Sequence, residues 1–541
     1  MENELSQILV GWLVAAGPLA LLSFALVPAS WLDRQPLQTS RVGAMISLAV
    51  FAVALATAVA RVRFGALDVS FALAGPFRLG VHLDNLSVIV LVLVAFLLAV
   101  VTRFSVNYLA GDPAQGRFTR WLCLTGGSVL TLVISGNMIQ FALAWSATSF
   151  CLHQLLVFYP ERTGAILAAR KKFIISRMGD ACMLGVIVLM FQTFHTWEFS
   201  EVLRAARQMH ESGAGLHPVA INAICFLLVA GAMLKSAQFP FHSWLPDTME
   251  TPTPVSALMH AGIINAGGFL IIRLSPLMTL SPLAMSTLAL FGAFTALFAS
   301  LVMLTHASVK RSLAFSTVAQ MGFMMLECGL GAFGLALLHL VAHSLYKAHA
   351  FLSSGSIVNL AKSAWVPTAR PNAHPLSLAA AFAAAIALAL GCAGLFGVDY
   401  LHERGALVLG CTFAMALAYA LWNLWSQSPD LKGAWFGALS GGGLAVAYFA
   451  LERIFVGLLG ERAWANEHLN SWPGLLLISA LLGLFLFVLV IQTELPNWAN
   501  RPWLQAVYVH ARNGFYFTTL ANRTVAALWP VKPFRSEPDK P

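Results

Sequence analysis

Long apolar windows recur along almost the whole chain and are separated by short polar segments. A helix needs about 20 mostly apolar residues to cross a bilayer, because a helix satisfies its backbone hydrogen bonds within itself. Windows of this kind predict about fifteen spans, near residues 5–28, 43–60, 84–104, 119–135, 138–158, 173–193, 219–245, 252–273, 282–304, 311–330, 333–358, 377–397, 406–426, 435–456 and 473–492. The pattern predicts an all-α polytopic membrane protein with about 13–15 transmembrane helices.

Composition agrees with this prediction. Of 541 residues, 59% are hydrophobic and 10% charged, and the mean hydropathy is +0.77. A soluble domain has about 25% charged residues, so these charges are too few to cover a water-soluble particle. The net charge of +9 is scattered over short loops, which argues against a nucleic-acid-binding surface and makes the lipid bilayer the expected surroundings. The seven cysteines have no metal-ligand spacing, so we expect no metal.

The order of the segments divides the chain into four expected parts. Residues 1–118 hold N-terminal spans, 119–400 the central core and 401–493 the C-terminal spans. The stretches 194–218 and 361–376 are expected to be loops. Within 494–541, aromatic and arginine side chains up to Trp529 suit an interfacial amphipathic helix, and the Pro-rich end is expected to be disordered.

Lys235 lies about sixteen residues into its predicted span, within GAMLKSAQFPFHSWLPD. Pro240, five residues later, blocks the carbonyl of Ser236, so we expect the helix to break beside the lysine. A broken helix with a buried lysine is a common way to build an ion site at mid-membrane. The alternative is a lysine near a helix end that reaches the headgroups.

Three polar residues recur at intervals of four in HLVAHSLYKAHAF: His339, His343 and Lys347. A helix turns about 400° in four residues, so the three side chains share one face and rise about 6 Å per step. We call this row the rail. Histidine titrates near neutral pH, so the rail could pass protons through intervening waters. A packing role for the histidines is the alternative, and His349 lies off the row.

Four further ionisable residues near or within the spans have open interpretations. Asp247 and Glu250 precede a proline-marked helix start, where acids are favourable near the surface, and His260 lies about two turns deeper as a channel candidate. Asp180 can pair with Arg177 three residues earlier.

Glu327 lies deep in an apolar run, MGFMMLECGL. It is either a protonated, silent glutamic acid or a member of a proton relay. Both interpretations stay open for this residue.

The runs SRMGDA, KSAQFPFHSWLPDTMETPTPVSALMHAG, KRSLAFSTVAQMGFM and HLVAHSLYKAHAFLSSGS resemble the L subunit of respiratory complex I and the large subunits of Mrp-type antiporters. The resemblance covers roughly residues 80–400. It implies two inverted five-helix repeats with broken helices and a chain of polar groups through the membrane centre. By matching position it assigns these groups to Asp180, Lys235, His260, His339, His343 and Lys347.

Two departures from the family pattern stand out. The family has a glutamate after the tryptophan of its fifth helix, where AWSATSF places Ser146. Its second repeat has a lysine before an aspartate, where GCAGLFGVDY places Val398 before Asp399. These losses put a complex I proton pathway in doubt.

With these losses the chain is most similar to the antiporter-like membrane subunits of bacterial inorganic carbon transporters. That likeness implies a non-enzymatic subunit of the bacterial inner membrane that uses a proton or sodium gradient to energise uptake of CO2 or bicarbonate. It also implies a DabA-like partner, a zinc protein similar to β-carbonic anhydrases. The alternatives are a monovalent cation/proton antiporter subunit and an L-type subunit of a respiratory NADH-quinone oxidoreductase. No residues resemble a flavin, quinone, haem, iron–sulfur or nucleotide site, so no cofactor is expected.

Overall fold

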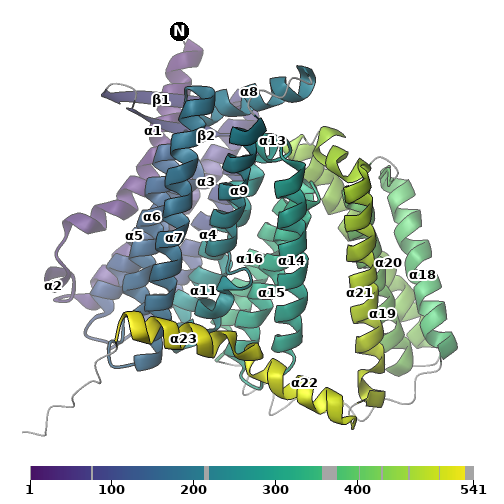
Figure 1. The fold of residues 1–541 in the computed structure, drawn as a ribbon. Coiled ribbons are helices and arrows are strands. Elements are labelled where there is room, and N and C mark those ends of the chain that lie inside the picture. The colour runs from purple at the N-terminus through teal and green to yellow at the C-terminus, as the bar shows by residue number, and fades with distance from the viewer. Residues whose placement is uncertain are drawn as a thin grey trace, which may run out of the picture.

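The computed structural model describes residues 2–74, 77–212, 218–355, 375–400, 403–427, 431–460, 463–498 and 500–530. Most of these residues form long helices that stand side by side (Figure 1). The elements of the first half are α1 (Glu2–Leu22), η1 (Ser23–Leu26), α2 (Ala29–Leu32), α3 (Pro36–Phe64), β1 (Leu67–Ala74), β2 (Phe77–Leu83), α4 (Asn85–Tyr108), α5 (Gln115–Ile134), α6 (Met138–Leu156), α7 (Thr163–Phe194), α8 (Phe199–Ser212), α9 (Pro218–Lys235), η2 (Phe241–Ser243), α10 (Trp244–Asp247), η3 (Thr248–Glu250), α11 (Thr253–Ala261), η4 (Ile263–Asn265) and α12 (Ala266–Arg273).

The second half continues the bundle and then adds a separate group of helices. Its elements are α13 (Ser275–Met278), α14 (Pro282–Met303), α15 (Val309–Gly329), α16 (Phe333–Leu352), α18 (Pro375–Phe396), α19 (Arg404–Gln427), α20 (Leu431–Leu459), η5 (Ala463–Asn470), α21 (Trp472–Trp498), α22 (Pro502–Arg512), η6 (Gly514–Tyr516) and α23 (Phe517–Leu528). The expected loop 361–376 and the expected disordered tail fall almost entirely outside the described residues.

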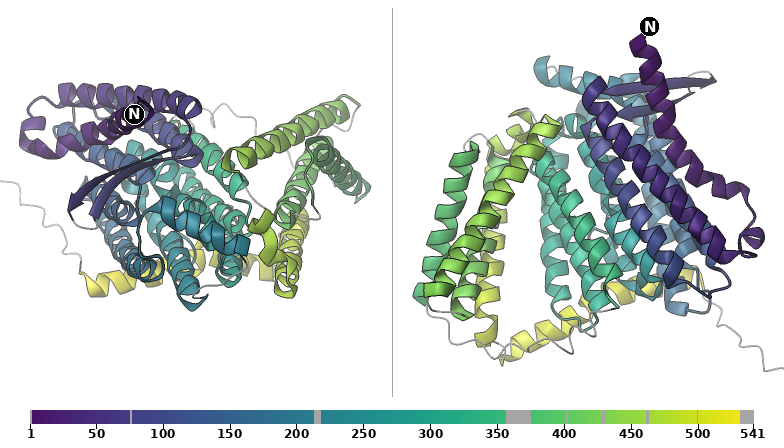
Figure 2. Two further views of the ribbon diagram at one scale, coloured as in Figure 1. Left: turned by 90° about the horizontal axis from the view of Figure 1, so that it is seen from above. Right: turned by 180° about the vertical axis from the view of Figure 1, so that it is seen from behind.

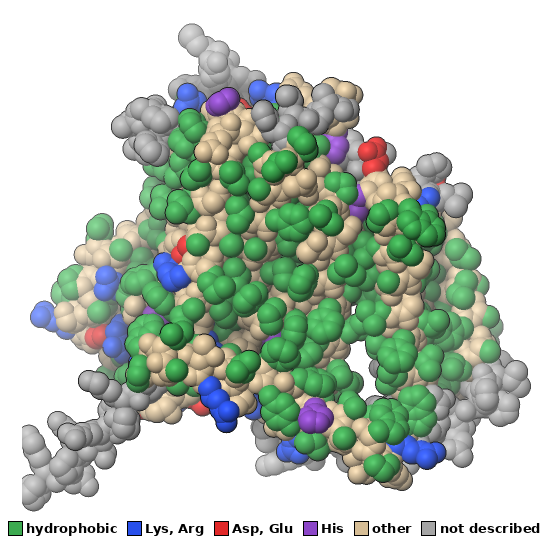
Figure 3. Space-filling view, viewed as in Figure 1, with side chains coloured by type: hydrophobic (Ala, Val, Ile, Leu, Met, Phe, Trp, Pro, Cys, Tyr) green, Lys and Arg blue, Asp and Glu red, His purple; other side chains and the backbone are tan. Residues whose placement is uncertain are grey.

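Eleven spans in the described part of the chain are long and apolar enough to cross a membrane, counting α11 and α12 as one. Four further helices, α5, α6, α15 and α16, have 19 to 21 residues each. Hydrophobic side chains are spread over the sides of the spanning helices on the face that Figure 3 shows, as expected for a surface that faces lipid. The prediction of a polytopic helical membrane protein is confirmed, and the inverted repeats stay a prediction.

The helices α1 to α16 form one bundle, and α18 to α21 form a second group beside it (Figure 2). The two groups meet where α16 packs against α20 and where α14 packs against α21. Helices α22 and α23 run along the lower edge in Figure 1, across the ends of the spanning helices. There Phe517 contacts Phe239 with ring centroids 4.7 Å apart, and Arg170 donates to the Trp529 carbonyl.

Two elements at the upper end of the bundle correct the sequence prediction. Strands β1 and β2 form an antiparallel hairpin in a chain expected to be all-α. Leu67, Val69 and Val81 are buried on one face of the hairpin, and Asp68 lies opposite His82 in the register. The expected loop 194–218 contains the amphipathic helix α8, whose residues Phe199, Val202, Leu203 and Ala206 are buried.

Two spanning helices are interrupted near the middle of the bundle. Helix α9 ends at Lys235, as predicted from Pro240, and Ala237 then adopts a positive φ of 50°. The second interruption separates α11 from α12 at Gly262, and the short turn η4 joins them. Broken spanning helices free backbone carbonyls only where protein or a cavity surrounds them, so both breaks mark a polar interior.

Candidate functional site

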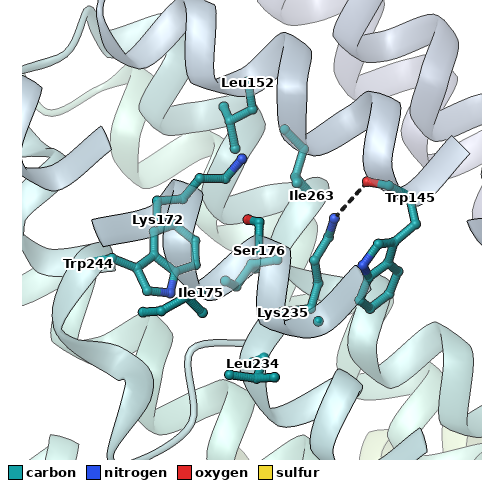
Figure 4. Close-up of a pocket in the computed structure, with 11 residues that line it drawn as sticks. Trp145, Leu152, Lys172, Ile175, Ser176, Leu234, Lys235, Trp244 and Ile263 are labelled. Atoms are coloured by element: carbon teal, nitrogen blue, oxygen red, sulfur yellow. Dashed lines mark hydrogen bonds between the residues drawn. The ribbon is translucent and has the colours of Figure 1, made fainter. Parts of the chain in front are cut away.

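Lys235 lies at the broken end of α9 and points toward α6 (Figure 4). Its Nζ donates to the Trp145 carbonyl at 3.3 Å and to Ser149 Oγ at 3.1 Å. The same Nζ lies 4.3 Å from the centroid of the Trp145 ring, a cation–π distance. Among the described residues the direct partners of this amine are therefore a carbonyl, a hydroxyl and an aromatic face, and Ser146 stands where the family has a carboxylate.

A cavity of about 20 Å³ adjoins Lys235 (Figure 4). Lys172 and Ser176 from α7 line it together with Lys235, and Trp244 and Ile263 lie on its walls. Lys172 is 4% exposed and its Nζ donates to the Ser149 carbonyl at 2.5 Å. The cavity is large enough for about one water molecule.

Asp180 lies two turns beyond Lys172 on α7. Its Oδ2 lies 2.7 Å from Arg177 Nη2, so the predicted ion pair is present. Asp180 is also an electrostatic neighbour of both Lys172 and Lys235. It therefore supplies negative charge near the two lysines without a direct contact to either.

The rail residues lie on one face of α16, as their spacing predicts. His339 Nδ1 and Glu327 Oε2 are 2.9 Å apart, and the rings of His339 and His343 have centroids 6.2 Å apart. Neither ring nitrogen of His343 has a hydrogen-bond partner within the described residues. Lys347 is fully buried and donates to Ser316 Oγ at 2.8 Å. The structure thus brings Glu327 to the upper end of the rail.

His260 lies beside the rail on α11. It is fully buried, its Nδ1 is 3.0 Å from Thr317 Oγ1, and its ring stacks on Phe351 of α16 at 4.3 Å between centroids. Its electrostatic neighbours include Lys347 and His343. Helix α15 therefore supplies polar partners to both His260, through Thr317, and Lys347.

Hydrogen bonds connect the two helix breaks to each other and to the rail. Ser236, which follows Lys235, donates from Oγ to the Ile264 carbonyl at 2.7 Å. Asn265, which follows Ile264, donates to Ser344 Oγ at 2.7 Å. Ser344 follows His343 on α16, so these hydrogen bonds join the two helix breaks to the helix that carries the rail.

The helix-start acids lie apart from this chain, at the lower end of the bundle. Asp247 accepts from the buried Lys171 and lies 3.8 Å from Arg311. The carboxylate of Glu250 accepts from the backbone N–H of Ala165 at 3.2 Å, in the first turn of α7. Both acids therefore hold helix ends together, which favours the structural interpretation.

A second charged cluster holds the hairpin against the upper end of the bundle. Asp84 caps α4 through the N–H of Ser87 and pairs with the buried Arg273 at 2.6 Å. The His82 ring nitrogens lie 3.7 and 3.8 Å from the carboxylates of Asp68 and Asp84. Burial lowers the pKa of His82, but the two carboxylates outweigh it and raise that pKa above its ordinary value.

Lys172 and Glu452 are buried ionisable residues that the sequence analysis did not name as candidates. Lys172 shares a helix face with Ser176 and Asp180 at intervals of four, which was the available signal for it. Glu452 on α20 is 4% exposed, and its Oε2 has no hydrogen-bond partner within the described part of the chain. A charged residue seven positions before the end of this apolar helix was the available signal for Glu452.

Two family models match the chain. The model for NADH:quinone oxidoreductase/Mrp antiporter transmembrane regions matches residues 135–364, and the model for the N-terminus of complex I chain 5 matches residues 72–119. Among solved structures, the Mrp complex from Dietzia sp. superimposes with a TM-score of 0.58 at 20% identity, covering 99% of this chain and 61% of that one. The archaeal membrane-bound sulfane sulfur reductase gives 0.55 at 18% identity, covering 83% and 74%. The antiporter-like fold is thereby confirmed.

Curated relatives identify a group within this family to which the chain is similar in sequence over most of its length. The probable inorganic carbon transporter subunit DabB2 of Halothiobacillus neapolitanus is 41% identical over 465 residues, which are 85% of this chain and 82% of the relative. The corresponding subunit DabB of Hydrogenovibrio crunogenus is 35% identical over 85% of this chain and 86% of its own. A quinone oxidoreductase chain 5 from Synechocystis sp. is 38% identical but covers only 54% of this chain and 43% of its own. The expectation of a transporter-type subunit rather than an enzyme is confirmed, and the chain belongs to the DabB family of antiporter-like membrane subunits.

Proposed function

We propose that this chain carries protons or sodium ions through the membrane and that the resulting flux energises uptake of CO2 or bicarbonate. Lys235 is the central switch of the path. The remaining members of the path are Asp180, His260, Glu327, His339, His343 and Lys347. The core segment 119–400 contains all seven residues.

The observation that carries the proposal is the set of ionisable side chains inside the bundle, at two helix breaks that are hydrogen-bonded to the helix of the rail. Ser236 bonds to Ile264 and Asn265 bonds to Ser344, so the two helix breaks and α16 are hydrogen-bonded to one another. Buried polar groups inside a membrane bundle are costly, and they persist where they serve a path for ions or protons. A packing role alone accounts for single histidines but not for a connected series.

Proton transfer along this series follows from the chemistry of its members. A neutral imidazole carries one donor and one acceptor nitrogen, so His339 and His343 can each take a proton on one side and release it on the other. Their ring centroids are 6.2 Å apart, so we assign proton transfer between the two rings to a bridging water. Glu327 Oε2 lies within hydrogen-bond distance of His339 Nδ1, so the carboxyl group and the imidazole can share a proton at the upper end of the rail.

Lys235 is suited to switching because its direct contacts are weak. A carbonyl, a hydroxyl and a π face stabilise an ammonium less than a carboxylate does. Release of the proton from this half-buried amine is therefore favoured when the neighbouring charge at Asp180 is shielded or moves away. A flux assay that detects sodium rather than proton transport through the same residues would identify sodium as the carried ion.

The partner we propose is a DabA-like zinc protein, similar to β-carbonic anhydrases, on the bacterial inner membrane. The support is that the relatives of this chain are named as subunits of an inorganic carbon transporter. Hydration of CO2 requires a metal-bound hydroxide, and that chemistry is assigned to the partner. This chain then supplies the ion flux.

The test is growth in ambient air of cells that lack carbonic anhydrase. We expect this chain together with the product of its neighbouring zinc-protein gene to restore growth, and ionophores that collapse both proton and sodium gradients to abolish it. Restoration by this chain alone would contradict the proposal, as would restoration by the pair that persists with the ionophores present. Cation/proton exchange by the chain without a carbon-dependent phenotype would favour the antiporter alternative.

A further inference from the structure

Lys172 is a buried amine, and no carboxylate in the described part of the chain is in direct contact with it. Its Nζ donates to the backbone carbonyl of Ser149, and the residue is 4% exposed. The preceding Lys171 is equally buried, yet it pairs with the carboxylate of Asp247. The two adjacent lysines of α7 therefore differ in kind, because one is neutralised by an ion pair and the other is not.

Lys172 and Lys235 converge on one residue of α6. Lys172 Nζ donates to the Ser149 carbonyl, and Lys235 Nζ donates to the Ser149 hydroxyl at 3.1 Å. Two ammonium groups this close in a buried site repel each other and lose their hydration. The Asp180 carboxylate, already paired with Arg177, is the acid in electrostatic range of both amines. One proton shared by the two amines is therefore favoured over two.

The cavity between these side chains supplies the connection. Its volume of about 20 Å³ holds one water molecule, and Lys172, Lys235 and Ser176 all line it (Figure 4). The rings and aliphatic chains of Trp244 and Ile263 form apolar parts of its wall. A single water here has amines and a hydroxyl as partners, which is the polar environment that a buried water needs.

We propose that Lys172 is a second proton-carrying group of the central site and exchanges a proton with Lys235 through this cavity. The inference rests on the proposed function, proton conduction through Lys235. In the exchange, the Lys235 ammonium gives a proton to the water, and the water gives one of its own protons to the Lys172 amine. Lys235 becomes a neutral amine, Lys172 becomes an ammonium, the water is restored and the net charge of the site is unchanged.

The position of Lys172 gives this exchange a direction. Its neighbour Lys171 contacts Asp247, and Phe173 packs on Trp529 at the end of α23 with ring centroids 6.0 Å apart. Helix α23 lies along the lower edge of the molecule in Figure 1. Lys172 therefore extends the path from Lys235 toward that edge, whereas the rail extends it through the interior to Glu327.

Proton flux into proteoliposomes, driven by a potassium diffusion potential and followed over a range of external pH, tests the exchange. Three variants of Lys172 separate proton transfer from positioning. Lys172→Met removes the amine, Lys172→Gln keeps a donor for the Ser149 carbonyl, and Lys172→Arg keeps a fixed positive charge. Lys310→Met is the matched control, since Lys310 donates to the Thr253 hydroxyl outside this site.

We expect all three Lys172 variants to lose flux at least tenfold across the pH range, while Lys310→Met stays within twofold of the unsubstituted protein. Normal flux in Lys172→Gln or Lys172→Arg overturns the inference, because a residue that only positions Ser149 is replaceable by another donor. Size-exclusion profiles and thermal unfolding of each variant in detergent identify misfolding, and the Gln variant carries the test if the Met variant fails to fold. If Lys235→Met conducts normally, the proposed function fails. If Lys235→Met is inactive and the Lys172 variants conduct, only this inference fails.

Discussion

Replacement of Glu327 by glutamine isolates the charge at the upper end of the rail. Glu327 Oε2 lies 2.9 Å from His339 Nδ1, and the two side chains are 7% and 11% exposed, so solvent screens their interaction little. Glu327→Gln keeps an acceptor oxygen for His339 but removes the negative charge. A hydrogen bond to a charged group contributes about 1.5–3 kcal/mol, against about 0.5–1.5 kcal/mol for a neutral one.

The difference of about 1–2 kcal/mol corresponds to a factor of about 5 to 30 in the strength of the Glu327–His339 bond. If proton transfer across this bond is an obligatory step, proton flux into proteoliposomes falls by up to the same factor. Glu327→Ala leaves His339 without its acceptor and has the larger effect. Glu161→Gln, at an exposed loop position, is the control and leaves flux unchanged. Flux in folded Glu327→Gln within twofold of the unsubstituted protein would show that the pair is structural.

Three further predictions concern the rail, the hairpin and the packing of the bundle. His339→Ala and His343→Ala each lower proton flux at least tenfold, and the double variant loses little more, because both histidines act in one path. Normal flux in both folded single variants would show that the two histidines are packing residues. The raised pKa of His82 means that its contribution to hairpin stability is full below about 6.5, the ordinary histidine value, and is lost as pH rises through the raised value. Burial raises the pKa of Asp68, but its bonds to His82 and Ser200 outweigh burial and lower that pKa. The Asp68 carboxylate therefore loses its contribution to hairpin stability only at strongly acidic pH. Hydrogen exchange of β1 and β2, corrected for intrinsic rates, is therefore slowest in mild acid and faster at alkaline pH, and equal protection in both conditions contradicts the assignment. A Cβ at Gly322 would lie 2.5 Å from the backbone nitrogen of Ala296 on α14, so Gly322→Ala destabilises the protein by about 1–3 kcal/mol. A Cβ at Gly443 meets no atom within 4 Å, so Gly443→Ala is the control. Equal thermal unfolding temperatures for the two variants would refute the close contact.

The spans and the rail could be predicted from the sequence because their signals are local. Apolar length identifies a span, and an interval of four places His339, His343 and Lys347 on one face without knowledge of any neighbour. Pro240 likewise predicts the end of α9, since its missing N–H and its ring act within one turn. These predictions depend only on helix geometry and on the thickness of a bilayer.

The hairpin and α8 were missed for a different reason. Leu67, Asp68 and Val69 alternate with a period of two, which differs from the long apolar run of a span. In α8, Phe199 and Val202 recur at helical spacing in an amphipathic pattern. Both patterns are shorter than the about 20 apolar residues that identify a spanning helix.

The partners of the site residues could not be predicted from local patterns. The shared contact of Lys172 and Lys235 with Ser149 depends on how α6, α7 and α9 pack, and the two lysines are 63 positions apart in the sequence. The link from Ser236 to Ile264 depends on two helix breaks that meet at the same depth. Tertiary packing determines such pairs, and spacing along one helix carries no information on them.

The central claim is that Lys235 moves charge by releasing its proton. Arginine at this position keeps a cation of similar reach but does not release its proton under physiological conditions. Proton flux by Lys235→Arg, measured in proteoliposomes beside the unsubstituted protein and Lys235→Ala, tests this claim most directly. We predict that both variants are folded and inactive, and flux at the unsubstituted rate in Lys235→Arg would contradict the account.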